Sequence, residues 1–184
     1  PRGFIRLLRC FLHEGITMMA AVRFAARYHA HECAVVSDNQ RIDYQDFYAF
    51  AKKLSYVLYH EYQLRSRQHV ALFCRNHLVS ALLLPALSRL GVNVKLLNTD
   101  LSNEQLLQLM SRPYALFIYD KELLQVENID ITCPQVSCES LLETIKEQLL
   151  TDNVVLPYIK RGGNISVMTG GSSGNYKEAA RKTG

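Results

Sequence analysis

Short apolar runs alternate with helical stretches through the middle of the chain, and this alternation constrains the fold more than any other feature. Residues 69–74, 92–97 and 114–119 are short, apolar and bounded by turn residues, which is typical of buried strands. Residues 78–90 and 104–111 lie between them and have helical character, and Gly91 is suited to end the first helix. Parallel strands need crossover connections of this kind. We therefore expect an α/β fold, with a parallel β-α-β layered sheet and flanking helices.

A long amphipathic helix is expected ahead of this alternation, from about residue 44 to residue 62. Asp43 is suited to cap its free N–H groups, and Asp46 places a negative charge in the first turn, where the helix dipole favours one. A shorter helix is expected at 141–150 and a last strand at 165–169. The apolar positions of the long helix recur at three- and four-residue spacing: Phe47, Phe50, Ala51, Leu54, Val57 and Leu58.

The last strand opens into the sequence T-G-G-S-S-G-N-Y-K at 169–177. Glycines let backbone N–H groups turn toward an anion, hydroxyls add donors, and the Lys177 ammonium can follow a mobile polyphosphate. The spacing differs from the P-loop, in which the lysine directly follows the last glycine, and from the G-x-G-x-x-G dinucleotide turn. The segment predicts a phosphate-binding loop, and a Gly/Ser-rich surface loop or linker is the alternative.

The same segment resembles the phosphate loop T-S-G-S/T-T-G-x-P-K-G of the AMP-forming acyl-adenylate superfamily, which includes the fatty acyl-CoA synthetases. Three positions depart from that motif: Gly170 replaces serine, Tyr176 replaces proline and Glu178 replaces glycine. The departures bear on phosphate affinity, because Glu178 adds a negative charge beside the expected phosphates. Six positions agree, the last of them conservatively: Thr169, Gly171, Ser172, Gly174, Lys177 and Ser173.

The resemblance extends beyond the loop. The segment at 41–47, R-N-H at 75–77 and L-L-N-T at 96–99 look like further segments of the acyl-CoA synthetases, in the same order. The matching segments span roughly residues 34–177, with an unmatched stretch at about 122–163. This order indicates the N-terminal part of an enzyme most like the long-chain fatty acyl-CoA synthetases, with the N-terminal subdomain of the acyl-adenylate-forming fold.

The resemblance implies ATP-dependent activation of a carboxylic acid through an acyl-adenylate, with ATP, Mg²⁺ and coenzyme A as cofactors of the intact enzyme. It places the adenine pocket, the acyl tunnel and a catalytic lysine downstream of the loop, so we assign no catalytic residue and expect this chain to be inactive without the C-terminal portion. An enzyme remnant or adaptor with the same fold, or an unrelated α/β nucleotide-binding module, are the alternatives. The residues expected to contact the ATP phosphates are Thr169, Gly170, Gly171, Ser172, Ser173, Gly174 and Lys177.

The chain divides by composition into three parts: a basic amphipathic segment at 1–30, an α/β subdomain at 31–169, and the phosphate loop with its tail at 170–184. The formal charge of +4 comes entirely from the first part, where five arginines face Glu14 alone. We favour a helix whose apolar face docks on the core, and peripheral contact with an anionic membrane is the alternative. Nucleic-acid binding is not expected, because no basic stripe with interleaved aromatics runs through the core.

Cysteine and histidine spacing predicts no metal site. Of five cysteines, the close pair is Cys133 and Cys138, and no second pair or histidine set complements it. We interpret the cysteines as mostly reduced core thiols, and His77 as a residue that orients the backbone of its turn. We find no signal peptide or membrane-spanning run in the sequence and therefore expect a cytoplasmic location, with membrane contact at most peripheral.

Overall fold

The computed structural model describes residues 2–37, 40–123, 131–147, 155–169 and 177–181. Six strands form the main sheet in the order β6-β5-β3-β4-β7-β8, in which the first five are parallel and β8 is antiparallel to β7. The expected parallel α/β sheet is therefore confirmed. The strands are β3 (His69–Phe73), β4 (Asn93–Leu96), β5 (Leu116–Tyr119), β6 (Gln135–Ser137), β7 (Ile165–Thr169) and β8 (Lys177–Arg181).

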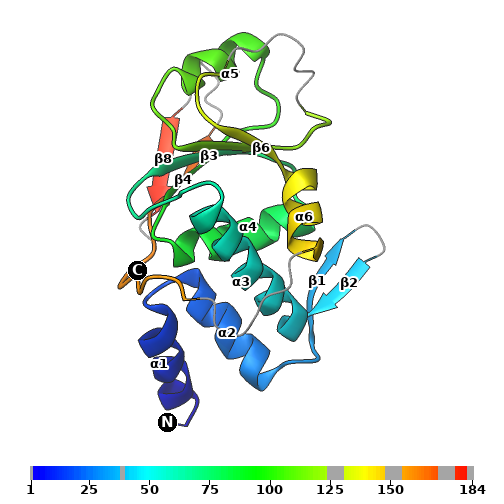
Figure 1. Ribbon diagram of the computed structural model, residues 1–184, viewed down its shortest axis with the longest axis vertical. Coiled ribbons are helices and arrows are strands. Elements are labelled where there is room, and N and C mark those ends of the chain that lie inside the picture. The colour runs from blue at the N-terminus through cyan, green and yellow to red at the C-terminus, as the bar shows by residue number, and fades with distance from the viewer. Residues whose placement is uncertain (1, 38–39, 124–130, 148–154, 170–176, 182–184) are drawn as a thin grey trace.

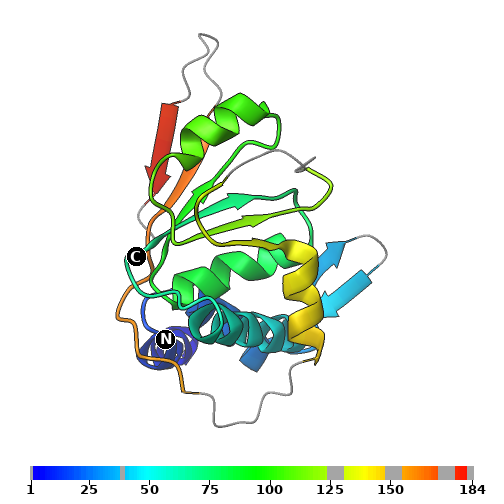
Figure 2. The same ribbon diagram turned by 45° about the horizontal axis from the view of Figure 1, so that its top comes forward.

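Helices cover both faces of the sheet (Figure 1). On one face lie α3 (Tyr44–His60), α4 (Leu78–Arg89) and α6 (Cys138–Glu147), with α2 (Met18–Tyr28) packed against α3 and α4. On the other face lies α5 (Asn103–Met110), which Figure 2 shows from a second direction. Strand side chains alternate between the two cores: Val70 and Leu72 belong to the core beneath α3 and α4, and Ala71 and Phe73 to the core beneath α5.

Side-chain caps fix where the helices begin. The Asp43 carboxylate accepts a hydrogen bond from the Asp46 N–H at 2.9 Å, which confirms the expected start of α3. The Ser102 hydroxyl accepts from the Gln105 N–H, and the Gln105 side chain accepts from the Ser102 N–H, so α5 begins with a capping box. Gly91 follows α4 with φ +68°, a left-handed conformation that favours glycine.

Several short strands were not expected from the sequence. A hairpin of β1 (Cys33–Ser37) and β2 (Gln40–Asp43) precedes α3, and residues 177–181, assigned by composition to the loop and tail, form β8. The three-residue β6 adds the outer parallel strand next to β5. β2 and β6 contain one apolar residue each and β8 contains two, which is too few to establish a period.

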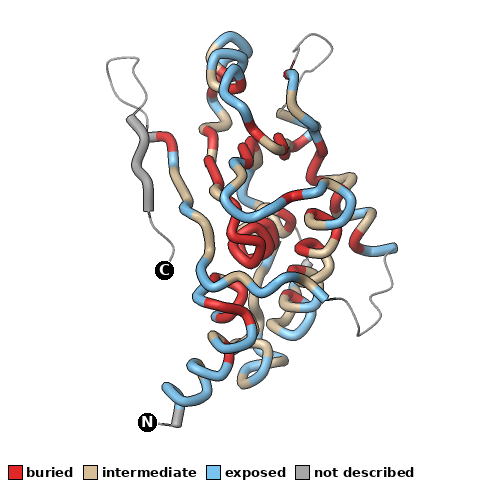
Figure 3. Tube along the Cα trace, turned by 60° about the vertical axis from the view of Figure 1, so that its left-hand side comes forward, coloured by how far each residue is buried: buried red, intermediate tan, exposed pale blue. Residues whose placement is uncertain are grey.

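The N-terminal helix α1 (Arg2–Glu14) packs against α2. Its docked side is short: Cys10 and Glu14 are buried, whereas Phe4 and Leu12 are 72% and 70% exposed. The exposed stretch near the N-terminus is visible in Figure 3. The expectation that the apolar face docks on the core therefore holds for only part of that face, because Leu7, Cys10 and Phe11 are buried or half-buried whereas Leu8 and Leu12 are exposed.

The strand β7 is positioned by the chain before it. Backbone hydrogen bonds join Ile16 to Lys160 and Gly162, each at 2.9 Å. They hold the segment before β7 against the residues that connect α1 to α2. The Asn164 N–H also donates to the Asn93 side chain at 3.0 Å, where β7 starts beside β4. Among the described helices, none combines the length and the apolar character that crossing a membrane requires.

Candidate functional site at the carboxyl edge of the sheet

The carboxyl ends of β3, β4 and β7 enclose a cavity of about 490 Å³. In open parallel sheets this edge is where ligands bind, because the connections there diverge and leave a crevice. The cavity brings together the R-N-H turn, the L-L-N-T segment and the end of β7, three of the segments on which the family resemblance was based. Its lining residues are Cys74, Arg75, Asn76, Leu96, Leu97, Asn98, Thr99, Val167 and Met168.

A second cavity, of about 680 Å³, adjoins the first and extends toward β1. The two share Cys74, Asn76, Leu96 and Leu97. Aliphatic side chains line much of the second cavity, so an apolar ligand group would fit there with polar groups at its rim. A smaller cavity of about 370 Å³ lies at the amino edge, against the first residues of β3 and β4. The carboxyl-edge cavities are the better candidates because the loop strand ends beside them.

The predicted phosphate loop connects β7 to β8. Thr169 is the last residue of β7 and Lys177 the first residue of β8, and the antiparallel register places these two opposite each other. The loop therefore leaves a parallel strand at the carboxyl edge, as a phosphate loop should. Gly170, Gly171, Ser172, Ser173 and Gly174 lie outside the described residues, so the phosphate contacts stay a prediction.

His77, the last residue of the R-N-H turn, makes polar contacts with both α4 and Asp120. In the neutral imidazole its Nδ1 accepts from the Ser80 N–H at 3.3 Å and caps α4, while its Nε2 lies 2.7 Å from Asp120 Oδ1. This agrees with the interpretation of His77 as a residue that orients the backbone. A hydrogen bond with Cys138 raises the pKa of His77 most, and the Asp120 carboxylate adds to the rise, so that the pKa reaches about 9 despite partial burial.

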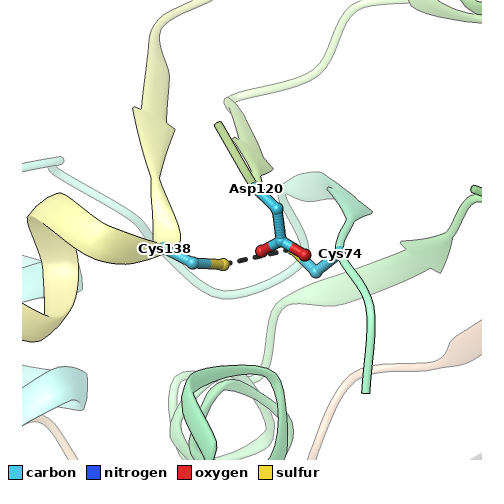
Figure 4. Close-up of side chains that lie close together, drawn as sticks. All are labelled: Cys74, Asp120 and Cys138. Atoms are coloured by element: carbon cyan, nitrogen blue, oxygen red, sulfur yellow. Dashed lines mark hydrogen bonds between the residues drawn. The ribbon is translucent and has the colours of Figure 1, made fainter. Parts of the chain in front are cut away.

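Two cysteines and an aspartate meet beside His77, and sequence reasoning missed them. Cys74 and Cys138 are separated by 64 positions, yet their sulfur atoms lie 3.3 Å apart. The ligand atoms of Cys74, Cys138 and Asp120 all lie within 4.8 Å of one another, and Figure 4 shows the three side chains converging. Spacing along the chain had indicated Cys133 as the neighbour of Cys138. We call Cys74, Asp120 and Cys138 the Cys-Asp-Cys cluster.

Solved structures match this architecture, although neither a family model nor a curated protein matches the sequence. The N-terminal domain of FACL13 from Mycobacterium tuberculosis, solved with an inhibitor, matches with a TM-score of 0.74 and 20% identity over 92% of this chain and 44% of that one. O-Succinylbenzoate coenzyme A synthetase (MenE) from Bacillus subtilis, in complex with AMP, matches with a TM-score of 0.70 and 17% identity over 88% and 41%. The N-terminal subdomain of Klebsiella oxytoca NpsA, with 3-hydroxybenzoyl-AMSN, matches with a TM-score of 0.71 and 17% identity over 91% and 41%.

The chain has the N-terminal subdomain of the adenylate-forming fold. These likenesses rest on the arrangement of elements, since identity is at most 20% in the three structures. The chain spans less than half of the length of each of them. The cavities at the carboxyl edge and the end of β7 are the candidate functional site of this chain.

Proposed function

We propose that this chain forms the N-terminal part of an ATP-dependent, AMP-forming acyl-CoA synthetase. The observation that carries the proposal is the convergence of the R-N-H turn, the L-L-N-T segment and the start of the predicted phosphate loop at one cavity of the adenylate-forming fold. Among the matched structures, those of the Bacillus subtilis synthetase contain AMP, or ATP and magnesium. The rest of the intact enzyme would be the principal partner of this chain.

The proposed reaction has two steps. In the first, a carboxylate oxygen of the acid bonds to the α-phosphorus of ATP while the bond from that phosphorus to the β-phosphate oxygen breaks, which gives an acyl-adenylate and pyrophosphate. In the second, the sulfur of coenzyme A bonds to the acyl carbon, the bond from that carbon to the phosphate oxygen breaks, and AMP leaves while the thiol gives up its proton. Both steps need stabilisation of charge on phosphate oxygens.

The loop residues would supply that stabilisation in the first step. Hydroxyls of Thr169, Ser172 and Ser173 and the backbone N–H groups of the loop glycines would bind the β- and γ-phosphates, with Lys177 as the mobile cation. These hydroxyl, N–H and ammonium groups are the donors that a polyphosphate accepts. The loop that carries them follows the carboxyl end of the parallel strand β7. Mg²⁺ would neutralise charge on the phosphates and be held largely by them. We assign no residue of this chain to coenzyme A.

The acid would be a fatty acid with a long alkyl chain. The cavity of about 680 Å³ supports this choice as an apolar wall of an acyl tunnel whose remainder the resemblance places downstream of the loop, because Leu72, Ala81 and Leu84 line it and apolar burial contributes about 25 cal/mol per Å². Replacing Leu84 with Asp would place a charge against the alkyl chain. In the intact enzyme we expect this variant to raise KM for long-chain acids more than for short ones, and equal changes for both would refute the assignment.

A location in the cytoplasm with peripheral membrane contact through α1 is also part of the proposal. The exposed side chains of Phe4, Ile5, Leu8 and Leu12 support it, together with the arginines of the same helix. The variant with Phe4 and Leu12 both changed to Ser should sediment less with vesicles that contain anionic lipid. Val36→Ser, at a site that is 71% exposed on β1, is the matched control and should sediment like the parent. Unchanged sedimentation of the double variant would refute membrane contact.

Titration of the intact enzyme with Mg·ATP tests the phosphate loop, because the resemblance places the adenine pocket downstream of the loop. Removing a charge-assisted hydrogen bond costs about 1.5–3 kcal/mol, so Lys177→Ala should weaken binding by roughly ten- to a hundredfold. Lys146→Ala, in the last turn of α6, removes the same charge far along the chain from the loop and should leave affinity unchanged. Equal affinities of the Lys177 variant and the parent would refute the assignment.

Activity measurements separate the chain from the intact enzyme. The chain alone, given ATP, a fatty acid and coenzyme A, should release no AMP, and detectable AMP would overturn the prediction that it is incomplete. In the intact enzyme, Lys177→Ala should slow AMP release. The alternative is a binding module with the same fold, which the replacements at Tyr176 and Glu178 favour; it predicts no Mg·ATP binding by the intact protein.

A further inference from the structure

The Cys-Asp-Cys cluster follows from the register of three neighbouring strands. Leu72 pairs with Ile118 on β5, and Ile118 pairs with Val136 on β6, so these three residues form one row across the sheet. All three face the core beneath α3 and α4. Two residues further along each strand, a side chain returns to the same face. Those positions are Cys74, Asp120 and Cys138, one beyond the last residue of β3, β5 and β6 respectively.

The strand order favours a metal ion over a disulfide between the two cysteines. Because β5 lies between β3 and β6, the two Cα atoms are separated by two strand spacings, about 9 Å. A disulfide requires Cα atoms about 4.4–6.8 Å apart, so it would need backbone movement. Two thiolates on one tetrahedral Zn²⁺ stand about 3.8 Å apart, given Zn–S bonds of about 2.3 Å. The observed sulfur separation of 3.3 Å needs an adjustment of only about 0.5 Å to reach that value.

The third ligand comes from the intervening strand and is already held in place. Asp120 Oδ1 accepts from His77 Nε2 at 2.7 Å, and Oδ2 accepts from the Arg75 N–H at 2.6 Å. Carboxylates that ligate metals are hydrogen-bonded in this way by groups behind them. His77 contacts Asp120 and the Ser80 N–H through its two nitrogens and also hydrogen-bonds Cys138, so it acts as a positioning residue for two of the ligands and not as a ligand.

Two cavities give an ion access to the cluster. Cys138 is the first residue of the ten-residue α6, so this helix fixes its position beside Cys74. Cys138 and Asp120 are buried, whereas Cys74 lines the cavity of about 680 Å³. A further cavity of about 250 Å³ reaches Cys138 from the side of Glu139 and Leu142.

We propose that Cys74, Asp120 and Cys138 bind one Zn²⁺ ion, with a fourth coordination position open to the adjoining cavities. Two thiolates select a soft or borderline metal, and a carboxylate completes a three-ligand set that Zn²⁺ accepts. The three ligands would then tie the carboxyl ends of β3, β5 and β6 together. This site is distinct from the phosphate loop and does not depend on the proposed function.

Titration of the reduced, metal-free chain with Co²⁺ and then with Zn²⁺ tests the proposal. We expect one Co²⁺ per chain, with absorption bands typical of thiolate-to-cobalt charge transfer in tetrahedral sites, and their loss when Zn²⁺ displaces Co²⁺. Cys74→Ser should roughly halve the charge-transfer intensity and weaken Zn²⁺ affinity by at least tenfold, as ligand-shell changes typically do. Cys133→Ser and Cys33→Ser, half-buried cysteines outside the cluster, are the matched controls and should bind like the parent.

Two readouts keep the test decisive if a cysteine variant folds poorly. His77→Asn leaves all three ligands and should lower Zn²⁺ affinity by roughly tenfold through loss of the bond to Asp120. In the unaltered chain, Zn²⁺ should raise the midpoint of thermal unfolding, whereas Mg²⁺ at equal concentration should not. Absence of stoichiometric Zn²⁺ binding, unchanged affinity of Cys74→Ser, or a Cys74–Cys138 disulfide that forms in air without loss of the fold would each overturn the proposal.

Discussion

Glu14 is the buried charge on which the attachment of the N-terminal helix depends. Its Oε1 accepts from Arg23 Nη1 at 2.8 Å and from the Tyr48 hydroxyl at 2.7 Å, and its Oε2 accepts from Arg89 Nε at 2.8 Å. The residue is only 6% exposed, and the Arg89 side chain is 10% exposed. One carboxylate therefore joins α1, α2, α3 and α4.

Glu14→Ala should lower the free energy of unfolding by about 3–5 kcal/mol, because it leaves the Arg89 guanidinium buried without its carboxylate, next to the neutral Pro157 carbonyl 2.9 Å away. With a urea dependence of about 2 kcal/mol per molar, the unfolding midpoint should fall by roughly 1.5–2.5 M, measured by circular dichroism at neutral pH. Glu32→Ala removes an exposed carboxylate that pairs with His29 and should change stability by less than about 1 kcal/mol.

The double variant Glu14→Ala/Arg89→Met isolates the pairing. Because it removes both charges, it should be less destabilised than the sum of the two single variants by at least about 1 kcal/mol. Additive effects, or a Glu14→Ala cost no greater than that of Glu32→Ala, would refute the account of a charge network buried at this helix junction.

The same network predicts a pH dependence with a definite sign. Burial alone would raise the pKa of Glu14, but hydrogen bonds from Tyr48 and Arg23 and the charges of both arginines outweigh it and hold the pKa below its usual 4.5. Stability from Glu14 is therefore fully present above the pKa of the unfolded chain and is lost as pH falls through the lower folded value. The difference in urea midpoint between the parent and Glu14→Gln should shrink as pH falls below about 4.5, and a difference that grows in acid would contradict this assignment.

Three further substitutions test the fold by the same urea assay. Gly91→Ala forces a side chain onto φ +68° and should cost roughly 1–2 kcal/mol, whereas Gly3→Ala, with open space around an added Cβ in α1, should cost nothing. Leu83→Ala empties a fully buried position of α4 and should cost about 2–5 kcal/mol, against less than about 1 kcal/mol for Leu107→Ala, which is 38% exposed. His77→Ala removes the cap of α4 and should cost about 1 kcal/mol, most of it restored in His77→Asn; equal stability of the Ala and Asn variants would argue against the cap.

The alternation of elements was legible in the sequence because each core strand and helix carries its own signal. The long helix expected at 44–62 is α3 (Tyr44–His60), and the apolar helix expected at 78–90 is α4 (Leu78–Arg89). Local chemistry sets the starts of α3 and α5, since Asp43 and Ser102 satisfy free N–H groups whatever surrounds them. The order of the strands in the sheet could not be predicted in this way. β4 and β7 are neighbours although about 70 residues separate them, and no local pattern specifies that pairing.

The outward side of α1 shows a different limit of sequence reasoning. The sequence of an amphipathic helix indicates that its apolar side packs against another apolar surface, but it does not identify that surface. In the structure Cys10 and Glu14 are buried while Leu12, between them in the chain, is 70% exposed, because residues two positions apart lie on opposite sides of a helix. Composition could not distinguish a docked helix from one that contacts a membrane, and the vesicle experiment above addresses the exposed part alone.

The Cys-Asp-Cys cluster escaped detection because metal motifs are sought as short spacings within one loop, whereas these ligands lie at the ends of three strands. A rule based on register would have found part of it. The strand expected at 69–74 ends with Cys74, and the strand expected at 114–119 is followed directly by Asp120, so both residues belong to the carboxyl edge of a parallel sheet. Cys138 required β6, whose three residues carry too little pattern to predict a strand. A site built from residues on several parallel strands can therefore be predicted from the sequence only if each of those strands can be predicted. Here β6 is the strand whose sequence pattern is too short for that.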